Sequence, residues 1–247
     1  MTVVGIIPAR YASTRFPGKP LAMIGGKPMI QRTCEQALKS SLDAVVVATD
    51  DERIFDTVLG FGGRAVMTGT DHRSGTDRCR EALDKLDDRF NAVVNIQGDE
   101  PFIDPRQIDQ LAGLVRGGTI ALATLARRIA DPEELENPNA VKVVFDSQGD
   151  ALYFSRHPIP YIRGIERCQW LGKAEYYRHL GLYAYTADTL RRIASLPPGR
   201  LEQLESLEQL RWLEHGLRIH VAITDIEGSY AIDTPQDLIS IPKELLA

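Results

Sequence analysis

The sequence predicts an α/β protein with an open, doubly wound, mostly parallel sheet. Aliphatic runs alternate with amphipathic helical patterns in the first half of the chain, which is typical of parallel strands joined by crossover helices. The aliphatic runs are continuous, which indicates strands that helices cover on both faces. With 247 residues, the chain is long enough to bury a sizeable core. We expect a single domain, 1–247, in which residues 130–190 form an excursion.

Five strands are expected in the first half, at residues 3–7, 44–49, 64–67, 92–97 and 120–126. Helical stripes of apolar residues lie between some of these strands, at 29–38, 79–86 and 108–115. The alternation of the two patterns is what predicts the crossover topology.

The second half has a different rhythm. Residues 141–146 and 151–155 flank the turn sequence SQGD and predict a β-hairpin. Residues 157–177 show little periodicity and are expected to form a loop. A strand at 180–185, a helix from Leu201 to Leu213 that ends at Gly216, a strand at 218–223 and a short C-terminal helix complete the prediction.

Composition excludes several classes of protein. The chain is 43% hydrophobic and 26% charged, as in ordinary soluble globular proteins. A net charge of −5 argues against nonspecific nucleic-acid binding. No apolar run approaches the ~20 residues that span a bilayer, and the start of the chain does not resemble a leader. We therefore expect a cytoplasmic protein without membrane insertion.

Cysteine and histidine give no sign of a disulfide framework or of a metal site. The three cysteines are odd in number and form no CxxC pair. Cys34 and Cys79 fall on apolar helical positions and are expected to be core residues. The five histidines show no metal-ligand spacing.

Charged residues follow four predicted strands. Ligands bind at the carboxyl ends of the strands in an open α/β sheet, so these segments are the candidate site. The segments are PARYASTRFPGKP, TDD, TGTDHRSGTDR and QGDEP, and they supply Arg10, Arg15, Lys19, Arg73, Arg78, Asp50, Asp71 and Asp99. Cations together with carboxylates are what a nucleoside triphosphate with Mg²⁺ requires. The alternative for any single residue is a surface ion pair of little consequence.

The predicted phosphate-binding segment matches neither of two common nucleotide-binding motifs. Gly18 and Lys19 are followed by Pro20, so the GxxxxGK[ST] pattern is missing, and the chain has no GxGxxG.

Several motifs carry a resemblance to a known family. PARYASTRFPGKPL followed by IGGKPMI resembles the signature of cytidylyltransferases that activate acidic sugars. TGTDHRSGTDR, NIQGDEP, NPNAVKVV, ALYFSR, RHLGLYAY, LEQLESLEQLR and AIDTPQDL are similar to segments of the CTP:3-deoxy-manno-octulosonate (Kdo) cytidylyltransferases of lipopolysaccharide biosynthesis. The resemblance covers essentially the whole chain and implies a nucleotide-diphospho-sugar transferase-like fold.

The resemblance implies attack of the anomeric hydroxyl of Kdo on the α-phosphate of CTP, with release of pyrophosphate. Arg10 and Lys19 would bind the triphosphate, and Asp99 and Asp233 would hold Mg²⁺. Each carboxylate also has a structural alternative, since Asp99 would cap a turn and Asp233 or Thr234 would cap a helix with Pro235 at its first position. The remaining implied nucleotide contacts are Pro8, Ala9, Ser74, Arg78 and Gln97.

The sugar-side positions of the family match Arg156, His179 and Tyr183 in this sequence. Glu205 and Gln209, four residues apart on the predicted late helix, would share one face and hydrogen-bond sugar hydroxyls. The alternatives are a solvated helix face for this pair and a buried strand histidine for His179. The family also implies a homodimer formed through the excursion.

Three alternative functions stay open at this point. Two of them keep the reaction but change the acidic sugar, to an amino-substituted Kdo analogue or to a sialic acid. The segments RHLG and LEQLR argue against a sialic acid. A catalytically silent nucleotide-binding regulator would be expected to have lost a metal ligand or phosphate cation, yet Arg10, Lys19, Asp99 and Asp233 are all present.

Overall fold

A computed structural model describes residues 1–12, 16–228, 230–242 and 245. The chain forms two compact units. Unit 1 comprises residues 1–121, 182–194 and 228–247, and unit 2 comprises residues 122–181 and 195–227.

Unit 1 contains the parallel sheet that the sequence predicts. Strand β1 (Val3–Ala9) lies between β4 and β6 and is parallel to both. The order is β10-β6-β1-β4-β5, in which only the last residues of β10 run antiparallel to β6. The other bounds are Ala44–Thr49 for β4, Ala65–Met67 for β5, Ala92–Asn95 for β6 and Tyr177–Thr186 for β10. The predicted mostly parallel α/β fold is confirmed.

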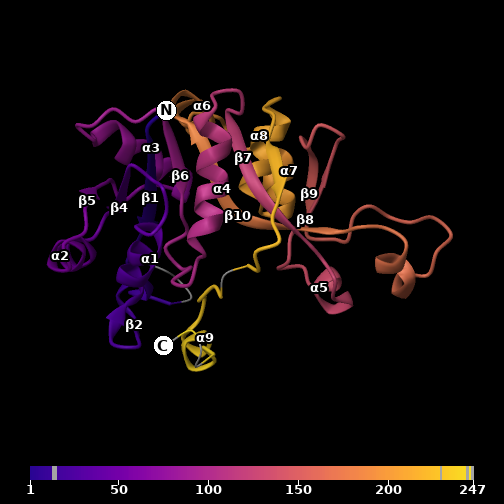
Figure 1. The fold of residues 1–247 in the computed structure, drawn as a ribbon, viewed down its shortest axis with the longest axis horizontal. Coiled ribbons are helices and arrows are strands. Elements are labelled where there is room, and N and C mark those ends of the chain that lie inside the picture. Colours follow the sequence, from indigo (N-terminus) through magenta and orange to yellow (C-terminus); the bar gives the residue numbers. More distant parts are fainter. Residues whose placement is uncertain (13–15, 229, 243–244, 246–247) are drawn as a thin grey trace. The chain divides into compact units, whose positions relative to one another are not determined.

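Helices cover these strands because their apolar faces match the buried strand residues (Figure 1). Helix α1 packs against α4, and α3 packs against α6. The bounds are Met29–Ala37 for α1, Glu52–Gly60 for α2, Gly75–Lys85 for α3, Pro105–Arg116 for α4 and Ala187–Ala194 for α6. Cys34 and Cys79 are buried in α1 and α3, as predicted.

Short elements complete unit 1. The 3₁₀ helix η1 (Lys19–Leu21) follows the segment after β1, and the strands β2 (Met23–Ile24) and β3 (Lys27–Pro28) form a small hairpin. Helix α9 (Pro235–Ile239) lies near the end of the chain.

Unit 2 is a second, smaller arrangement of strands and helices. Strands β7 (Leu122–Arg128) and β11 (His220–Ile223) are parallel neighbours. Strands β8 (Lys142–Phe145) and β9 (Ala151–Ser155) form the predicted antiparallel hairpin, and β8 also pairs with the start of β10. The helical elements are α5 (Pro132–Glu136), η2 (Arg167–Gly172), α7 (Arg200–Glu205) and α8 (Glu208–Glu214).

The prediction of one helix from Leu201 to Leu213 is wrong. Helix α7 ends at Glu205, Ser206 has a left-handed backbone (φ 53°), and α8 begins after Leu207. A helix cannot continue through a left-handed residue, so the apolar periodicity spans two short helices. The predicted end is confirmed, because Gly216 follows α8 with a positive φ of 72°.

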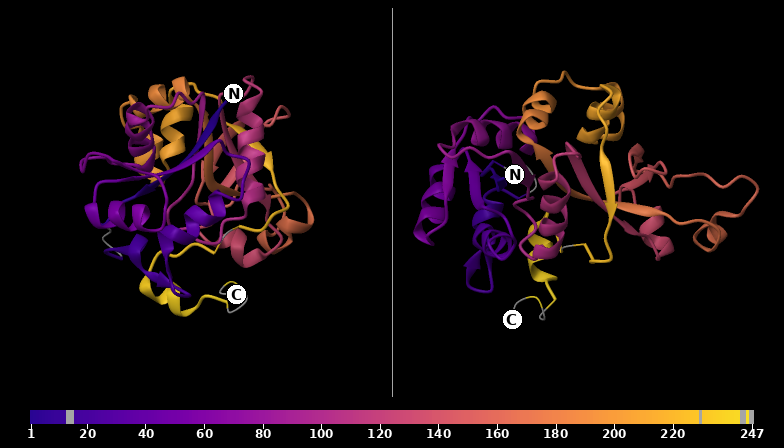
Figure 2. Two further views of the ribbon diagram at one scale, coloured as in Figure 1. Left: turned by 60° about the vertical axis from the view of Figure 1, so that its left-hand side comes forward. Right: turned by 45° about the horizontal axis from the view of Figure 1, so that its top comes forward.

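Both tryptophans of the chain lie in unit 2, and both are buried. Trp170 packs with Ile129, Leu135 and Tyr176. This cluster anchors residues 157–175, which were predicted as a loop but contain η2, and which extend away from the β8–β9 hairpin (Figures 1 and 2).

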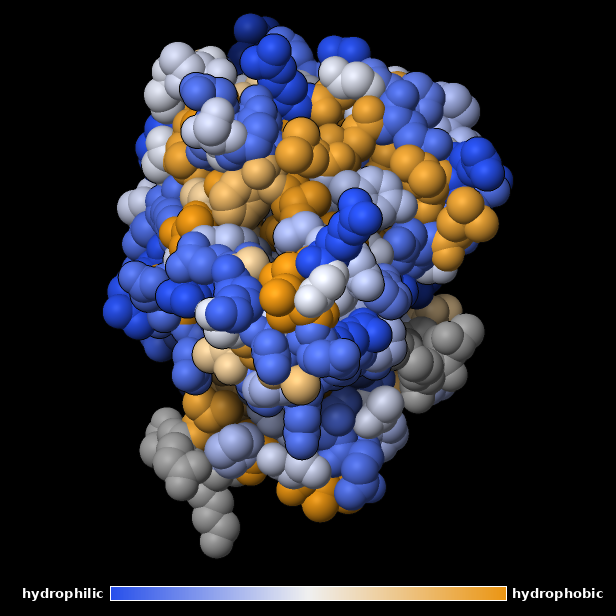
Figure 3. Space-filling view, turned by 90° about the vertical axis from the view of Figure 1, so that its right-hand side faces the viewer, coloured by the Kyte–Doolittle hydropathy of each residue, from blue (hydrophilic) through white to orange (hydrophobic). Residues whose placement is uncertain are grey.

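Four large apolar side chains of unit 2 are exposed: Leu152, Tyr161, Leu204 and Ile223. Figure 3 shows one face of the molecule on which apolar groups lie among hydrophilic ones. Within the described part of the chain, no helix has the length and apolar character needed to cross a bilayer.

Candidate functional site

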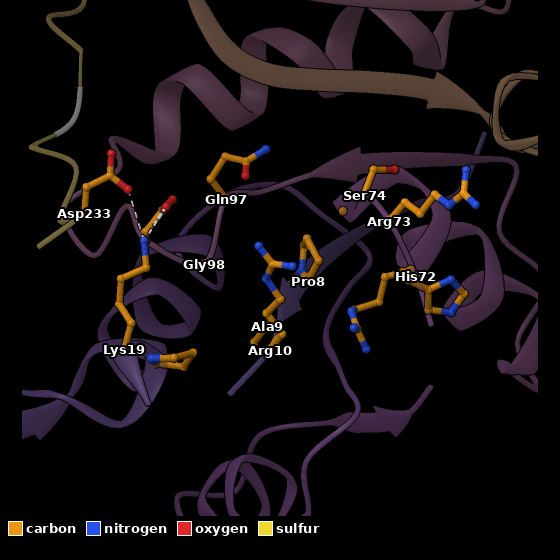
Figure 4. Close-up of a pocket in the computed structure, with 14 residues that line it drawn as sticks. Pro8, Ala9, Arg10, Lys19, His72, Arg73, Ser74, Gln97, Gly98 and Asp233 are labelled. Atoms are coloured by element: carbon orange, nitrogen blue, oxygen red, sulfur yellow. Dashed lines mark hydrogen bonds and ion pairs between the residues drawn. The ribbon is translucent and has the colours of Figure 1, made fainter. Parts of the chain in front are cut away.

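A pocket of about 320 Å³ lies in unit 1 at the carboxyl ends of β1 and β6. All nine residues implied as catalytic or nucleotide-binding line it: Pro8, Ala9, Arg10, Lys19, Ser74, Arg78, Gln97, Asp99 and Asp233. Figure 4 shows Lys19 and Asp233 on one side of the pocket and His72, Arg73 and Ser74 on the other. The strand-end prediction therefore located the pocket.

Lys19 joins the two carboxylates at one end of the pocket. Its Nζ lies 2.7 Å from Oδ2 of Asp99 and 3.3 Å from Oδ1 of Asp233. The lysine side chain is only 15% exposed, whereas the carboxylates are 30% and 45% exposed. Two carboxylates from positions 134 residues apart in the chain thus converge on a single cation.

The C-terminal segment is held so that Asp233 reaches this point. The amide N–H of Ile232 donates to the Asp99 carbonyl at 3.0 Å, and the Ile232 side chain packs against Ile24 and Met29. Thr234, rather than Asp233, is the N-cap of α9, with Asp237 completing a capping box. The Asp233 carboxylate is therefore not the cap and remains directed at Lys19.

Asp237 supports this turn electrostatically. Its Oδ2 accepts from the backbone N–H groups of Asp233 and Thr234, at 2.9 and 2.7 Å. These backbone hydrogen bonds, first that from Asp233 and then that from Thr234, lower the pKa of Asp237. The carboxylate is thus kept ionised and fixes the backbone at the Asp233 position.

Glycine allows the backbone around Pro8 to approach closely. A Cβ on Gly98 would lie 2.9 Å from the Pro8 carbonyl oxygen, and one on Gly75 would lie 3.1 Å from the Pro8 ring. The end of β1 is therefore held between the residue before Asp99 and the first turn of α3.

Tyr11 and Arg53 brace the segment that leaves β1. The Gly18 N–H donates to the Tyr11 carbonyl at 2.9 Å, and the Tyr11 ring lies directly over Gly18. The Arg53 guanidinium lies 3.3 Å from the centroid of the Tyr11 ring, while Asp51 holds Arg53 through two side-chain hydrogen bonds. Arg15 lies outside the described residues.

Arg78 organises the loop before α3. It is buried and donates to Oδ2 of Asp50 at 2.9 Å, to the hydroxyl of Thr68 and to the Gly69 carbonyl. Ser74 caps α3 by accepting from the Asp77 N–H at 3.2 Å, which leaves its own O–H able to donate toward the pocket.

The sequence did not identify His72 and Glu81 as site residues. His72 lines the pocket, and its Nε2 is in hydrogen-bond contact with Oε2 of Glu81 in α3. No sequence signal reveals this pair, because the two residues are nine positions apart and only the fold of the loop brings them together.

The residues implied on the sugar side are divided between the two units. In unit 2, the backbone N–H of Arg156 donates to Oε2 of Glu205 at 2.9 Å, and its Nε donates to the Glu205 carbonyl at 2.7 Å. Ser155 donates to the other carboxylate oxygen of Glu205. The structure thus brings Arg156 and Glu205 together, with Glu205 as an acceptor for residues at the end of β9.

Lys142 also supports Arg156. This fully buried ammonium donates to the carbonyl of Arg156 at 2.8 Å and to that of Asn137 at 2.9 Å. Burial lowers the pKa of Lys142, and the two carbonyls partly compensate for the loss of water.

The predicted pairing of Glu205 with Gln209 on one helical face is wrong. Glu205 is the last residue of α7, whereas Gln209 belongs to α8 and is buried. The left-handed Ser206 turns the chain between them, so the i, i+4 relation of a continuous helix does not apply.

His179 and Tyr183 are buried strand residues of β10. The His179 Nε2 lies 2.9 Å from the Thr124 hydroxyl, and burial lowers the pKa of His179 to about 3. Tyr183 belongs to unit 1, where its ring stacks near that of Tyr185 with centroids 6.0 Å apart.

The donor set at Lys19 suits a magnesium ion. Among the described residues, no group of three or more His, Cys, Asp or Glu side chains is placed to hold a metal. Asp99 and Asp233 nevertheless converge on one cationic group, and Mg²⁺ commonly uses one or two carboxylates together with substrate phosphates. The residues present therefore fit a metal that arrives with a nucleotide.

Comparison with known proteins adds independent findings. Residues 4–219 match the family model described as cytidylyltransferase. A 3-deoxy-manno-octulosonate cytidylyltransferase of Parabacteroides distasonis is 53% identical over 242 residues, which cover 96% of each chain. An 8-amino-3,8-dideoxy-manno-octulosonate cytidylyltransferase of Shewanella amazonensis is 52% identical, again over 96% of each chain.

A solved structure is similar throughout the chain. It is a CMP:2-keto-3-deoxy-manno-octonic acid synthetase complexed with CTP, with a TM-score of 0.88 and 44% identity. The similarity covers 97% of this chain and 96% of that chain.

Proposed function

We propose that this chain, a member of the cytidylyltransferase family, transfers CMP from CTP to Kdo. The proposal follows its similarity to the 3-deoxy-manno-octulosonate cytidylyltransferases. The anomeric hydroxyl oxygen bonds to the α-phosphorus, and the bond from that phosphorus to the bridging oxygen breaks. The hydroxyl proton passes to solvent, and the products are pyrophosphate and CMP-Kdo, the activated sugar of lipopolysaccharide biosynthesis. CTP is an intracellular nucleotide, so we place this reaction in the cytoplasm.

The observation that carries the proposal is the convergence of Lys19, Asp99 and Asp233 at one end of the pocket. Such a displacement needs positioning and charge neutralisation more than covalent help. Asp99 and Asp233 would hold Mg²⁺, which neutralises charge on the phosphates when it is bound. Lys19 would then turn from the carboxylates to the triphosphate, where it and Arg10 stabilise the departing pyrophosphate.

The other end of the pocket would receive the nucleoside. Ser74 and Gln97 line the pocket with groups that hydrogen-bond to a base or a ribose. Arg78 is committed to Asp50 and Thr68, so we propose that it holds the loop in place as well as contacting the nucleotide.

The sugar carboxylate calls for a guanidinium, which we propose is that of Arg156. The Arg156 guanidinium donates to the carbonyls of Glu205, Pro138 and Ser206, which fixes the side chain and leaves two of its five N–H groups for the sugar carboxylate. His179 and Gln209 are buried in unit 2 and Tyr183 is buried in unit 1, so the proposal that each contacts the sugar rests on the family's motifs alone.

The test is release of pyrophosphate by the purified protein. We expect release only when CTP, Kdo and Mg²⁺ are all present, and loss of the signal when any one of them is omitted. Binding of CTP without pyrophosphate release from any acidic sugar would contradict the proposal and favour a silent nucleotide-binding regulator.

A second candidate substrate is 8-amino-3,8-dideoxy-manno-octulosonate, because relatives of similar identity carry that name. Kdo, the amino analogue and N-acetylneuraminate should be compared as acceptors at equal concentration. We expect the highest kcat/KM with Kdo; a higher value with the amino sugar would reassign the substrate.

A further inference from the structure

The carboxylate of Glu81 is the anchor of the loop at the nucleoside end of the pocket. Its two oxygens accept from the Gly69 N–H at 3.2 and 3.1 Å, and Oε2 also contacts Nε2 of His72. Lys85, one turn further along α3, pairs with Oε1 at 2.7 Å. One side chain thus binds the loop at two positions, residues 69 and 72.

Two side chains of α3 hydrogen-bond to the backbone of Gly69, one at its N–H and one at its carbonyl. Glu81 accepts from its N–H, and Arg78, three residues earlier in α3, donates to its carbonyl at 3.3 Å. Residues three apart lie on one face of a helix, so α3 fixes the loop backbone through two oppositely charged side chains.

The loop fits closely around this anchor. A Cβ on Gly69 would lie 2.9 Å from Oδ1 of Asp71 and 3.5 Å from Oε2 of Glu81. The first contact is with the flexible end of a side chain and the second is an ordinary van der Waals distance, so the loop packs closely at Asp71 and lies next to the Glu81 carboxylate.

Glu81 is ionised under ordinary conditions. Burial alone would raise the pKa of Glu81, but hydrogen bonds from Lys85, Gly69 and His72 lower it to about 2. An ionised carboxylate only accepts hydrogen bonds, so Nε2 of His72 must carry the proton in this contact.

The loop that Glu81 holds is part of the pocket wall. His72, Arg73 and Ser74 line the pocket, at the opposite side from Lys19 and Asp233 (Figure 4). If the triphosphate lies at Lys19, the base and ribose lie against this loop. A side chain that fixes the loop therefore acts on the nucleoside half of the substrate.

We propose that Glu81 is a positioning residue for the nucleoside of CTP, acting through Gly69 and His72. The inference rests on the proposed function, since it assumes CTP as the nucleotide. It goes further in assigning to a residue outside the pocket lining the task of holding the loop in its binding conformation. Its effect is on nucleoside binding and leaves triphosphate binding unchanged.

The test compares CTP with inorganic tripolyphosphate, which has phosphates and no nucleoside, by calorimetric titration in the presence of Mg²⁺. We expect Glu81→Gln to weaken CTP binding about tenfold, the effect of losing one charge-assisted hydrogen bond. Tripolyphosphate affinity should stay within about twofold of wild type. In the enzymatic assay, KM for CTP should rise while kcat at saturating CTP is retained.

Asp84→Asn is the matched control. Asp84 also lies in α3 and pairs with Arg80 and Arg191, away from the loop. This variant removes a carboxylate of the same helix and should bind both ligands as wild type does. Melting curves of Glu81→Gln and Asp84→Asn show whether the fold is retained.

Two outcomes would overturn the inference. Equal losses of CTP and tripolyphosphate affinity would show that Glu81 supports the pocket as a whole, and unchanged CTP affinity would show that it positions nothing. If Glu81→Gln does not fold, Glu81→Asp, which keeps the charge but shortens the reach to Gly69 and His72, is tested in the same two titrations, with the same expected loss of CTP affinity.

The result is separable from that of the proposed function. Wild-type protein that binds CTP but releases no pyrophosphate with Kdo would contradict the enzymatic proposal, while the binding comparison would still decide the role of Glu81. Failure of the wild type to bind CTP would contradict both.

Discussion

At the scale of single residues, the proposed chemistry is concentrated where three charged side chains meet. Lys19 stands between Asp99 and Asp233, so the negative charge of two carboxylates is partly balanced before any ligand arrives. The ammonium group of Lys19 is also the group that would pair with the phosphates of an incoming nucleotide. An exchange of partners at Lys19 would thus accompany binding of the metal and nucleotide.

Asp99→Asn tests the metal-binding role. The amide keeps the shape of the side chain but loses the charge that Mg²⁺ requires, so kcat should fall at least about a hundredfold. Pyrophosphate release measures the rate, and circular dichroism establishes that the variant is folded. A near-normal rate would remove Asp99 from the mechanism.

His179 predicts a dependence of stability on pH. Burial lowers the pKa of His179 to about 3, from 6.5 for an exposed histidine, so the folded protein keeps this ring neutral where the unfolded chain protonates it. Its contribution to stability is complete above pH 6.5 and is lost as pH falls from 6.5 toward 3. The slope is at most about 1.4 kcal/mol per pH unit.

The measurement is the free energy of unfolding of wild type and His179→Gln from pH 7 to pH 5. Glutamine retains a hydrogen-bonding group but does not titrate, so the wild-type value should fall more steeply than that of the variant. Parallel curves would show that the pKa of His179 is the same in the folded and the unfolded protein.

At the scale of elements, two close backbone approaches shape the pocket. Strand β1 ends at Ala9, and the chain after β6 passes it at Gly98 with no room for a side chain. The position of Pro8 in the pocket wall therefore depends on the residue that precedes Asp99.

Gly98→Ala should damage the pocket. The added methyl group would lie 2.9 Å from the Pro8 carbonyl, a backbone atom, so one of the strand ends must move. We expect a loss of about 1–3 kcal/mol in stability and weaker CTP binding, measured by denaturation and calorimetry.

Gly113→Ala provides the comparison. Gly113 lies in α4, where a Cβ would have no atom within 4 Å, and alanine favours a helix interior by about 0.5–1 kcal/mol. This variant should therefore be more stable than wild type with unchanged CTP affinity. Equal effects of the two substitutions would contradict the importance of the contact at Pro8.

The elements also show what the sequence could and could not predict. The strands of unit 1 were predictable because β1, β4 and β6 are continuous buried aliphatic runs, and their ends located the pocket. The break at Ser206 was not, because LEQLESLEQL keeps its apolar period across it. The contacts of Glu81 with Gly69 and His72 arise from a loop that folds back, which periodicity does not record.

At the scale of the whole molecule, the family resemblance predicts that the chain forms a homodimer. The exposed side chains of Leu152 and Tyr161 are large apolar groups of the excursion, and they would lose water contact in a dimer. We expect sedimentation at micromolar concentration to give twice the mass of one chain. A monomeric profile would contradict the dimer.

The placement of the two tryptophans has an optical consequence. Trp170 and Trp212 are both buried in unit 2, while the pocket proposed to bind the nucleotide is built from unit 1 residues. Tryptophan fluorescence, excited selectively, therefore reports the unfolding of unit 2. A nucleotide that binds the folded pocket stabilises unit 1 by mass action. Fluorescence melts with and without CTP would reveal, with no label attached, whether stability gained in one unit is transmitted to the other.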